Sequence, residues 1–106
     1  MAIMASVLQH VQAPLQVISE CVKRAKLVII TEGLFRDLEG IGPICRLHPS
    51  EENLDWGSWW NFSTSFFAQY LKVIGYGNQL ITFHKQEYHD DRGIHHPELF
   101  TIVAHS

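Results

Sequence analysis

The residues best suited to chemistry lie near the C-terminus of this 106-residue chain. Five of the seven histidines fall between residues 84 and 105, in a stretch where two segments, 79–88 and 99–105, flank the polar turn at residues 90–93. Alternation of apolar and polar residues in both segments predicts β-strands, and the turn predicts that they pair as an antiparallel hairpin. The hairpin must therefore position most of the candidate metal-ligating and proton-transferring side chains.

The register of this hairpin decides which side chains meet. A turn centred on residues 92–93 pairs His89 with His96 and Glu87 with Glu98, and strand alternation places all four on one face. Two imidazoles and two carboxylates in cross-strand contact suit zinc, iron or manganese, and no other cofactor is indicated. The sequence thus suggests a divalent-metal site at Glu87, His89, His96 and Glu98; the alternative is a solvated rim of strand-end side chains.

A short motif in the second half of the hairpin suggests acid-base chemistry instead. The stretch His95-His96-Pro97-Glu98, followed by Leu99 and Phe100, resembles the His-His-Pro-Glu-aromatic stretch of pterin-4a-carbinolamine dehydratases. The resemblance implies that His95 and His96 lie at a pterin pocket and act as catalytic residues that handle protons. In that family a long helix runs into the motif, and a strand with another histidine and a final helix follow it. Residues 79–88 here predict a strand, so the match is confined to residues 95–100 and no family is assigned.

The second candidate surface is the aromatic stretch from residue 56 to residue 62, which holds all three tryptophans. Clustered tryptophans fill a core, line a pocket or anchor a protein interface. Base stacking normally comes with basic residues, which this stretch lacks. We predict a partner-binding aromatic patch formed by Trp56, Trp59, Trp60 and Phe62, with core packing as the alternative.

Charge and composition narrow the classes of partner. The net charge is -3, which argues against binding to a nucleic acid backbone, although Lys23, Arg24 and Lys26 form a local basic cluster. At the end of a predicted helix these residues also complement the helix dipole. No apolar run approaches the roughly 20 residues needed to span a bilayer, and the N-terminus lacks a positively charged leader. We expect a cytoplasmic protein with no membrane segment, whose Cys21 and Cys45 are reduced.

The predicted elements that position these sites are helices in the first and middle thirds of the chain and strands between and after them. Apolar residues spaced three and four apart over 3–25 predict a helix, which Pro14 divides into a short N-terminal helix and a second helix beginning at the proline. A further helix is predicted over 65–74, ended by Gly75, with a strand over 70–74 as the alternative. A short helix is expected within 32–39.

Four segments predict strands: 27–31, 44–48, 79–88 and 98–105. Together with the helices they predict a single α+β domain over residues 1–106, with helices packed on one face of a small antiparallel or mixed four-stranded sheet. An exposed edge strand of such a sheet offers a route to a homo-oligomer.

The function that these observations favour is a small acidic protein-binding module, of inhibitor, immunity or accessory type, that contacts a protein partner through its aromatic patch. The alternative is a small enzyme or ligand-binding domain with a His/Glu site on the C-terminal hairpin. Its chemistry would be either metal-dependent or the acid-base chemistry of a pterin dehydratase.

Overall fold

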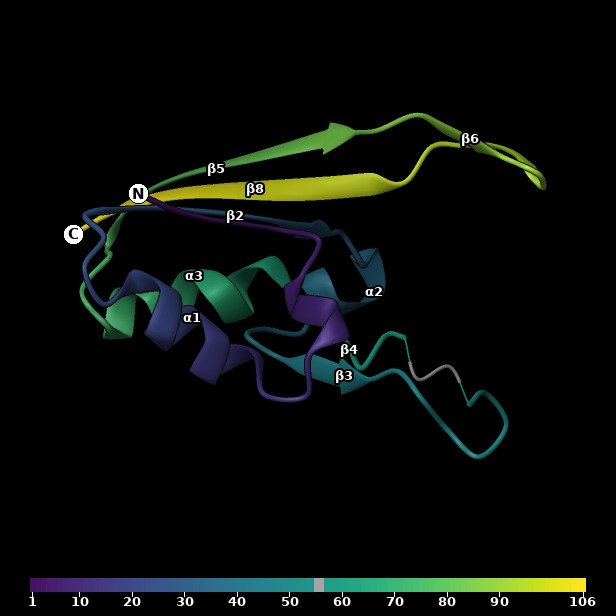
Figure 1. The fold of residues 1–106 in the computed structure, drawn as a ribbon, viewed down its shortest axis with the longest axis horizontal. Helices are drawn as coiled ribbons and strands as arrows, with labels where there is room; N and C mark the ends of the chain where they lie inside the picture. Colours follow the sequence, from purple (N-terminus) through teal and green to yellow (C-terminus); the bar gives the residue numbers. More distant parts are fainter. Residues whose placement is uncertain (55–56) are drawn as a thin grey trace.

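The computed structural model describes residues 1–54 and 57–106. Four strands form the main sheet, in the order β1 (Ala2–Ala5), β2 (Leu27–Gly33), β8 (Glu98–His105) and β5 (Asn78–Lys85). β1 and β2 are parallel, whereas β2 pairs with β8 and β8 with β5 in antiparallel register. The predicted mixed four-stranded sheet in an α+β chain is confirmed (Figure 1).

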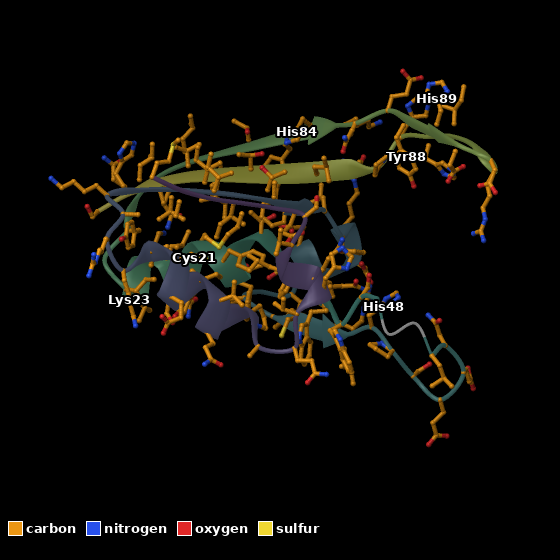
Figure 2. The ribbon with its side chains drawn as sticks, viewed as in Figure 1. Cys21, Lys23, His48, His84, Tyr88 and His89 are labelled. Atoms are coloured by element: carbon orange, nitrogen blue, oxygen red, sulfur yellow. The ribbon has the colours of Figure 1, made fainter. Side chains whose placement is uncertain are left out.

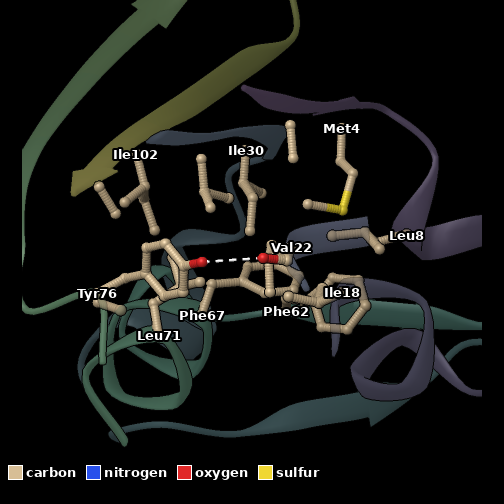
Figure 3. Close-up of a cluster of buried hydrophobic side chains, with 14 of the residues drawn as sticks. Met4, Leu8, Ile18, Val22, Ile30, Phe62, Phe67, Leu71, Tyr76 and Ile102 are labelled. Carbon is tan, nitrogen blue, oxygen red and sulfur yellow. Dashed lines mark hydrogen bonds between the residues drawn. The ribbon is translucent and has the colours of Figure 1, made fainter. Parts of the chain in front are cut away.

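Alternate residues of the sheet are buried in the main hydrophobic core. In β2, and in β8 from Phe100 onward, the even-numbered residues are buried, including Val28, Ile30 and Ile102. They share one cluster with side chains of α1 (Pro14–Val22) and α3 (Thr64–Val73), among them Ile18 and Phe67 (Figure 3). Because a strand sends alternate side chains to opposite faces, this pattern identifies the core-facing side of the sheet.

The two longer helices begin and end where local chemistry predicts. α1 starts with Pro14 in its first turn, where the missing backbone N–H costs no hydrogen bond. Ser63 caps α3, since its hydroxyl oxygen accepts a hydrogen bond of 3.2 Å from the N–H of Phe66. Gly75 follows α3 with a φ of 102°, which a residue without Cβ adopts readily. The helices predicted from Pro14 and over 65–74 are confirmed, and the alternative strand over 70–74 is wrong.

The predicted N-terminal helix is wrong. Residues 2–5 form β1, and only residues 8–10 are helical, as one 3-10 turn (Leu8–His10). Each residue of β1 pairs with one of β2, from Ala2 with Val28 to Ala5 with Thr31. In a short segment, apolar residues fit the helical period and the strand period equally well. The hydrogen bonds that decide for a strand come from β2, and local spacing does not encode them.

The middle of the chain differs from the prediction in two further places. β2 runs on to Gly33, so the short helix α2 begins only at Arg36 and ends at Glu39. The predicted strand 44–48 is a three-residue strand, β3 (Cys45–Leu47), which pairs with β4 (Trp60–Phe62) in a separate two-stranded sheet. The prediction that residues 44–48 belong to the main sheet is wrong, because β1 takes the place beside β2.

The C-terminal hairpin forms, but in another register. Beyond β5 and β8 it continues as β6 (Tyr88–Asp90) and β7 (Gly93–His95), with Tyr88 opposite His95 and Asp90 opposite Gly93. The turn is therefore at Asp91 and Arg92 and not at residues 92–93. Two features fix it: the N–H of Arg92 donates to Oδ1 of Asp90 at 2.8 Å, and Gly93 has a φ of 122°. The predicted pairings of His89 with His96 and of Glu87 with Glu98 are wrong.

Candidate functional site

The predicted aromatic patch is divided between the core and the surface. Phe62 is 1% exposed and packs against the rings of Phe66 and Phe67, with ring centroids 5.4 and 4.5 Å away. It belongs to the core because β4 turns this side chain toward α3. Trp59 and Trp60 are half-buried. The assignment of Trp56 falls outside the described residues.

Backbone and side-chain hydrogen bonds hold the tryptophan segment against the start of α1. The N–H of Trp59 donates to the carbonyl oxygen of Gln9 at 2.6 Å, and the indole N–H of Trp60 donates to the carbonyl oxygen of Gln12 at 3.1 Å. These bonds join the tryptophan segment to the 3-10 helix and to the loop that leads from it into α1. The indole of Trp60 is therefore positioned beside the first turn of α1.

Trp60 lines the first of two neighbouring hollows, and we call the two hollows together the apolar groove. The first has a volume of about 290 Å³ and the second about 210 Å³, and both are lined by Leu15 and Phe66. No Asp, Glu, Lys or Arg lines either hollow within the described part of the chain. The other described lining residues come from α1, α3, β4 and the segment around β3: Ala13, Pro14, Gln16, Pro43, Cys45, Gln69, Tyr70 and Val73.

Cys45 adds no charge to this groove. Although Cys45 is exposed, desolvation by its neighbours raises the pKa of its thiol, because it disfavours the thiolate. A protonated thiol packs as a small apolar group. The groove therefore presents aromatic, aliphatic and sulfur surface, with amide groups of Gln16 and Gln69 at its margin.

The histidines predicted to be catalytic lie on and beside the protruding hairpin, as do the residues of the predicted metal site. Figure 2 shows Tyr88 and His89 there, far from His48 and Cys21. The ring of His95 stacks on that of Tyr88, with centroids 4.7 Å apart, and its Nε2 lies 2.9 Å from Oδ1 of Asp90. His96 is exposed. Of these two adjacent histidines, His95 is the one whose ring stacks on an aromatic ring and lies beside a carboxylate.

In the observed register the residues of the predicted metal site have other cross-strand partners than those predicted. His89 is opposite Ile94, and Nε2 of His89 lies 4.0 Å from a carboxylate oxygen of Glu87. Glu98 is opposite Lys85 and forms two hydrogen bonds with Arg36, of 2.6 and 3.0 Å. These bonds hold the pKa of Glu98 below its ordinary value. Among the residues that the structure describes, no group of three His, Cys, Asp or Glu side chains is arranged to hold a metal ion.

A more polar cleft of about 420 Å³ lies where the hairpin leaves the sheet. Its polar side chains are those of Ser6, Gln9, Gln86, Tyr88 and Glu98, and the remaining walls are Gly33, Leu34, Phe35, Pro97 and Leu99. This volume is within the range of small-molecule sites, about 300–1,000 Å³. Of the residues predicted for the site on the hairpin, Glu98 is the one that lines this cleft.

Sequence reasoning missed most of the groove. Leu15 and Phe66 read as core-facing residues of their helices, and Pro43 and Cys45 carried no functional signal. The tryptophan cluster was the usable signal, and it led to Trp60. The other walls come from segments far apart in the sequence, so spacing along the chain does not reveal that they meet.

Comparison with known proteins adds no family. No family model matches the chain, and neither a curated protein nor a solved structure matches it. None of the described helices is long and apolar enough to cross a membrane.

Proposed function

We propose that this chain is a small protein-binding module whose apolar groove takes the apolar side chains of one segment of a protein partner. The observation that carries the proposal is the groove around Trp60, Leu15 and Phe66, which has no charged residue in its described lining. Aromatic residues in apolar hollows are the usual anchors of protein interfaces. The modest length and net charge of -3 are in keeping with an inhibitor, immunity or accessory protein.

The shape of the groove favours a peptide segment over a small molecule. Each of its two hollows, at about 290 and 210 Å³, falls below the usual size of a small-molecule site. Two adjoining hollows with common walls at Leu15 and Phe66 suit two successive apolar side chains on one face of a partner segment. Because the described lining is uncharged, we expect the affinity to depend only weakly on salt.

The two cysteines allow the proposal to be tested by site-specific crosslinking. A benzophenone maleimide on Cys45, in a Cys21→Ser background, places the crosslinker in the groove. The same reagent on Cys21, in a Cys45→Ser background, places it on an exposed part of α1 that does not line the groove. Irradiation in native lysate, followed by mass spectrometry, is expected to yield one dominant protein adduct from Cys45 that is absent from Cys21.

A charge inside the groove provides the second half of the test. Gln16→Lys puts an ammonium group at the groove without removing a buried side chain, whereas Gln86→Lys adds the same charge to the hairpin. We expect Gln16→Lys to abolish the Cys45 adduct and Gln86→Lys to leave it intact, with unchanged circular dichroism for both. Equal adducts from the two cysteines, or an adduct insensitive to Gln16→Lys, would contradict a groove-bound partner.

The polar cleft favours a second candidate function, the binding of a small ligand. Its volume of about 420 Å³ and its hydroxyl, amide and carboxylate groups provide both room and directional contacts. A thermal-shift panel of divalent metals, chelator and small heteroaromatic compounds tests it. A shift that Tyr88→Ala and Gln86→Ala both reduce would support this function, and a flat panel would count against it.

A further inference from the structure

The main sheet has a second face that is distinct from the core and from the apolar groove. Figure 1 shows α1 and α3 on one side of the sheet, and no described helix or strand lies over the other side. The side chains of this outer face follow from the burial pattern and the strand register. They are Ile3, Ala5, Leu27, Ile29, Thr31, Gly33, Asn78, Leu80, Thr82, His84, Leu99, Thr101, Val103 and His105.

An apolar row crosses this face from edge to edge. Ile3 is opposite Ile29, Ile29 is opposite Val103, and Val103 is opposite Leu80, so each of the four strands contributes one branched side chain. The edge residues Ile3 and Leu80 are 60% and 65% exposed. Such a continuous row is unusual on a surface that meets only water.

The positions of this face in the four strands hold no Asp, Glu, Lys or Arg. Charged residues make up 18% of the chain, and the four strands contain Glu32, Lys85 and Glu98. All three occupy positions of the opposite, core-facing side. Because the face lacks these charged side chains, removing it from water costs less free energy.

Two of the threonine hydroxyl groups on the face, those of Thr31 and Thr101, are already paired with each other. Oγ1 of Thr31 lies 2.8 Å from Oγ1 of Thr101, and Nε2 of His84 lies 2.9 Å from the same threonine oxygen. Polar groups that already form hydrogen bonds within the face lose less free energy when water is excluded, because they keep a partner. The row next to the apolar residues can therefore be covered without leaving these hydroxyls unsatisfied.

We propose that two copies of this chain pack their outer sheet faces together across a two-fold axis. A two-fold axis brings the apolar row of one copy onto the same row of the other, so the face is complementary to itself without any charged partner. From strand spacing and rise, the four strands present roughly 450 Å² of flat area per copy, before side-chain relief is counted. The pair thus buries about 1,000 Å² or somewhat more, near the lower limit for a specific dimer. Two twisted sheets pack in this way at about 10 Å.

Light scattering after size exclusion, from micromolar to millimolar concentration, tests the proposal on the intact chain. We expect the wild type to approach twice the mass of one chain as concentration rises. Val103→Lys places a charge at the centre of the face and Leu80→Lys at its edge, and each should weaken the dimer by about a hundredfold or more. Leu80 is exposed, so its variant remains informative if Val103→Lys fails to fold.

Ile41→Lys is the matched control. Ile41 is 66% exposed, close to the value for Leu80, but lies outside the four strands. The control should dimerise as the wild type does. A wild type that stays monomeric at the highest concentration would overturn the proposal. A dimer that survives both Leu80→Lys and Val103→Lys would overturn it too, since pairing would then use another surface, such as the free edge of β5.

Discussion

The backbone N–H of Leu8 donates a hydrogen bond of 2.7 Å to Oε1 of Glu32, while Oε2 of the same carboxyl is buried without a partner among the described residues. Glu32 is 1% exposed. The side chain of Glu32 therefore links the 3-10 helix to β2. This link requires a carboxyl group to be removed from water, which costs free energy. Desolvation raises the pKa of Glu32, and this effect outweighs the lowering by the nearby backbone N–H groups of residues 7–9 and by His10.

Glu32 should make the protein less stable as pH rises. The pKa of Glu32 is higher in the folded than in the unfolded state. Its stabilising contribution to the free energy of unfolding is therefore fully present below the ordinary pKa of about 4.5, and it is lost as pH rises through the folded pKa. Each unit of pKa difference is worth about 1.4 kcal/mol. Glu32→Gln keeps an acceptor for Leu8 and cannot titrate. Urea unfolding of both proteins across this pH range should show a wild-type decline that the variant lacks; parallel curves would contradict the assignment.

Two of the surface ion pairs, Arg36–Glu98 and Arg46–Asp37, should control the pKa values of their carboxyls separately. Arg36 holds the pKa of Glu98 below its ordinary value, chiefly through a hydrogen bond, and Arg46 does the same for Asp37. Arg36→Gln should raise the pKa of Glu98 and leave that of Asp37 unchanged. Arg46→Gln should do the reverse. Carbon-detected NMR titration of the side-chain carboxyls measures both, and a shift at both sites in either variant would show that the pairs are coupled.

Ser63 should be a key polar residue of the fold. Its hydroxyl oxygen accepts from the N–H groups of Phe66 and Ile44, at 3.2 and 3.0 Å, and its hydrogen is donated to the carbonyl oxygen of Gly42 at 2.7 Å. Ser63→Ala removes the helix cap and leaves buried partners unsatisfied, so we expect a loss of about 2 kcal/mol in the free energy of unfolding. Ser19→Ala, at the surface of α1, is the control and should change it by less than about 0.5 kcal/mol.

Tyr76 should stabilise the end of α1 through its hydroxyl. The buried O–H donates to the carbonyl oxygen of Val22 at 3.0 Å (Figure 3). It also donates to the carbonyl oxygen of Ala25. Tyr76→Phe keeps the ring in the core and removes these bonds, which should cost about 1–2 kcal/mol in chemical denaturation. Tyr70→Phe loses only a long bond of 3.4 Å to Leu15 and should cost under about 0.5 kcal/mol. Equal losses for the two variants would show that the Tyr76 hydroxyl contributes nothing specific.

Features governed by a few neighbouring residues could be predicted from the sequence. Pro14 begins α1, Gly75 follows the end of α3, and the apolar run after residue 26 forms a central strand. Each depends on interactions within one or two turns of chain, which residue types specify directly. The C-terminal hairpin could also be predicted from the sequence, since alternation of apolar and polar residues and a polar turn are local signals.

The position of β1, the groove and the hairpin register were decided only by tertiary structure. Residues 2–5 become a strand because β2 offers hydrogen bonds from 26 residues away, and the groove exists because Leu15, Cys45, Trp60 and Phe66 converge from four segments. In the hairpin, the observed pairing of His89 with Ile94 differs by two residues from the predicted pairing with His96. A strand repeats every two residues, so that shift leaves every side chain on the same face. Alternation in the sequence therefore determined the faces of the hairpin, whereas the turn conformation of Asp90 and Gly93 determined which side chains meet.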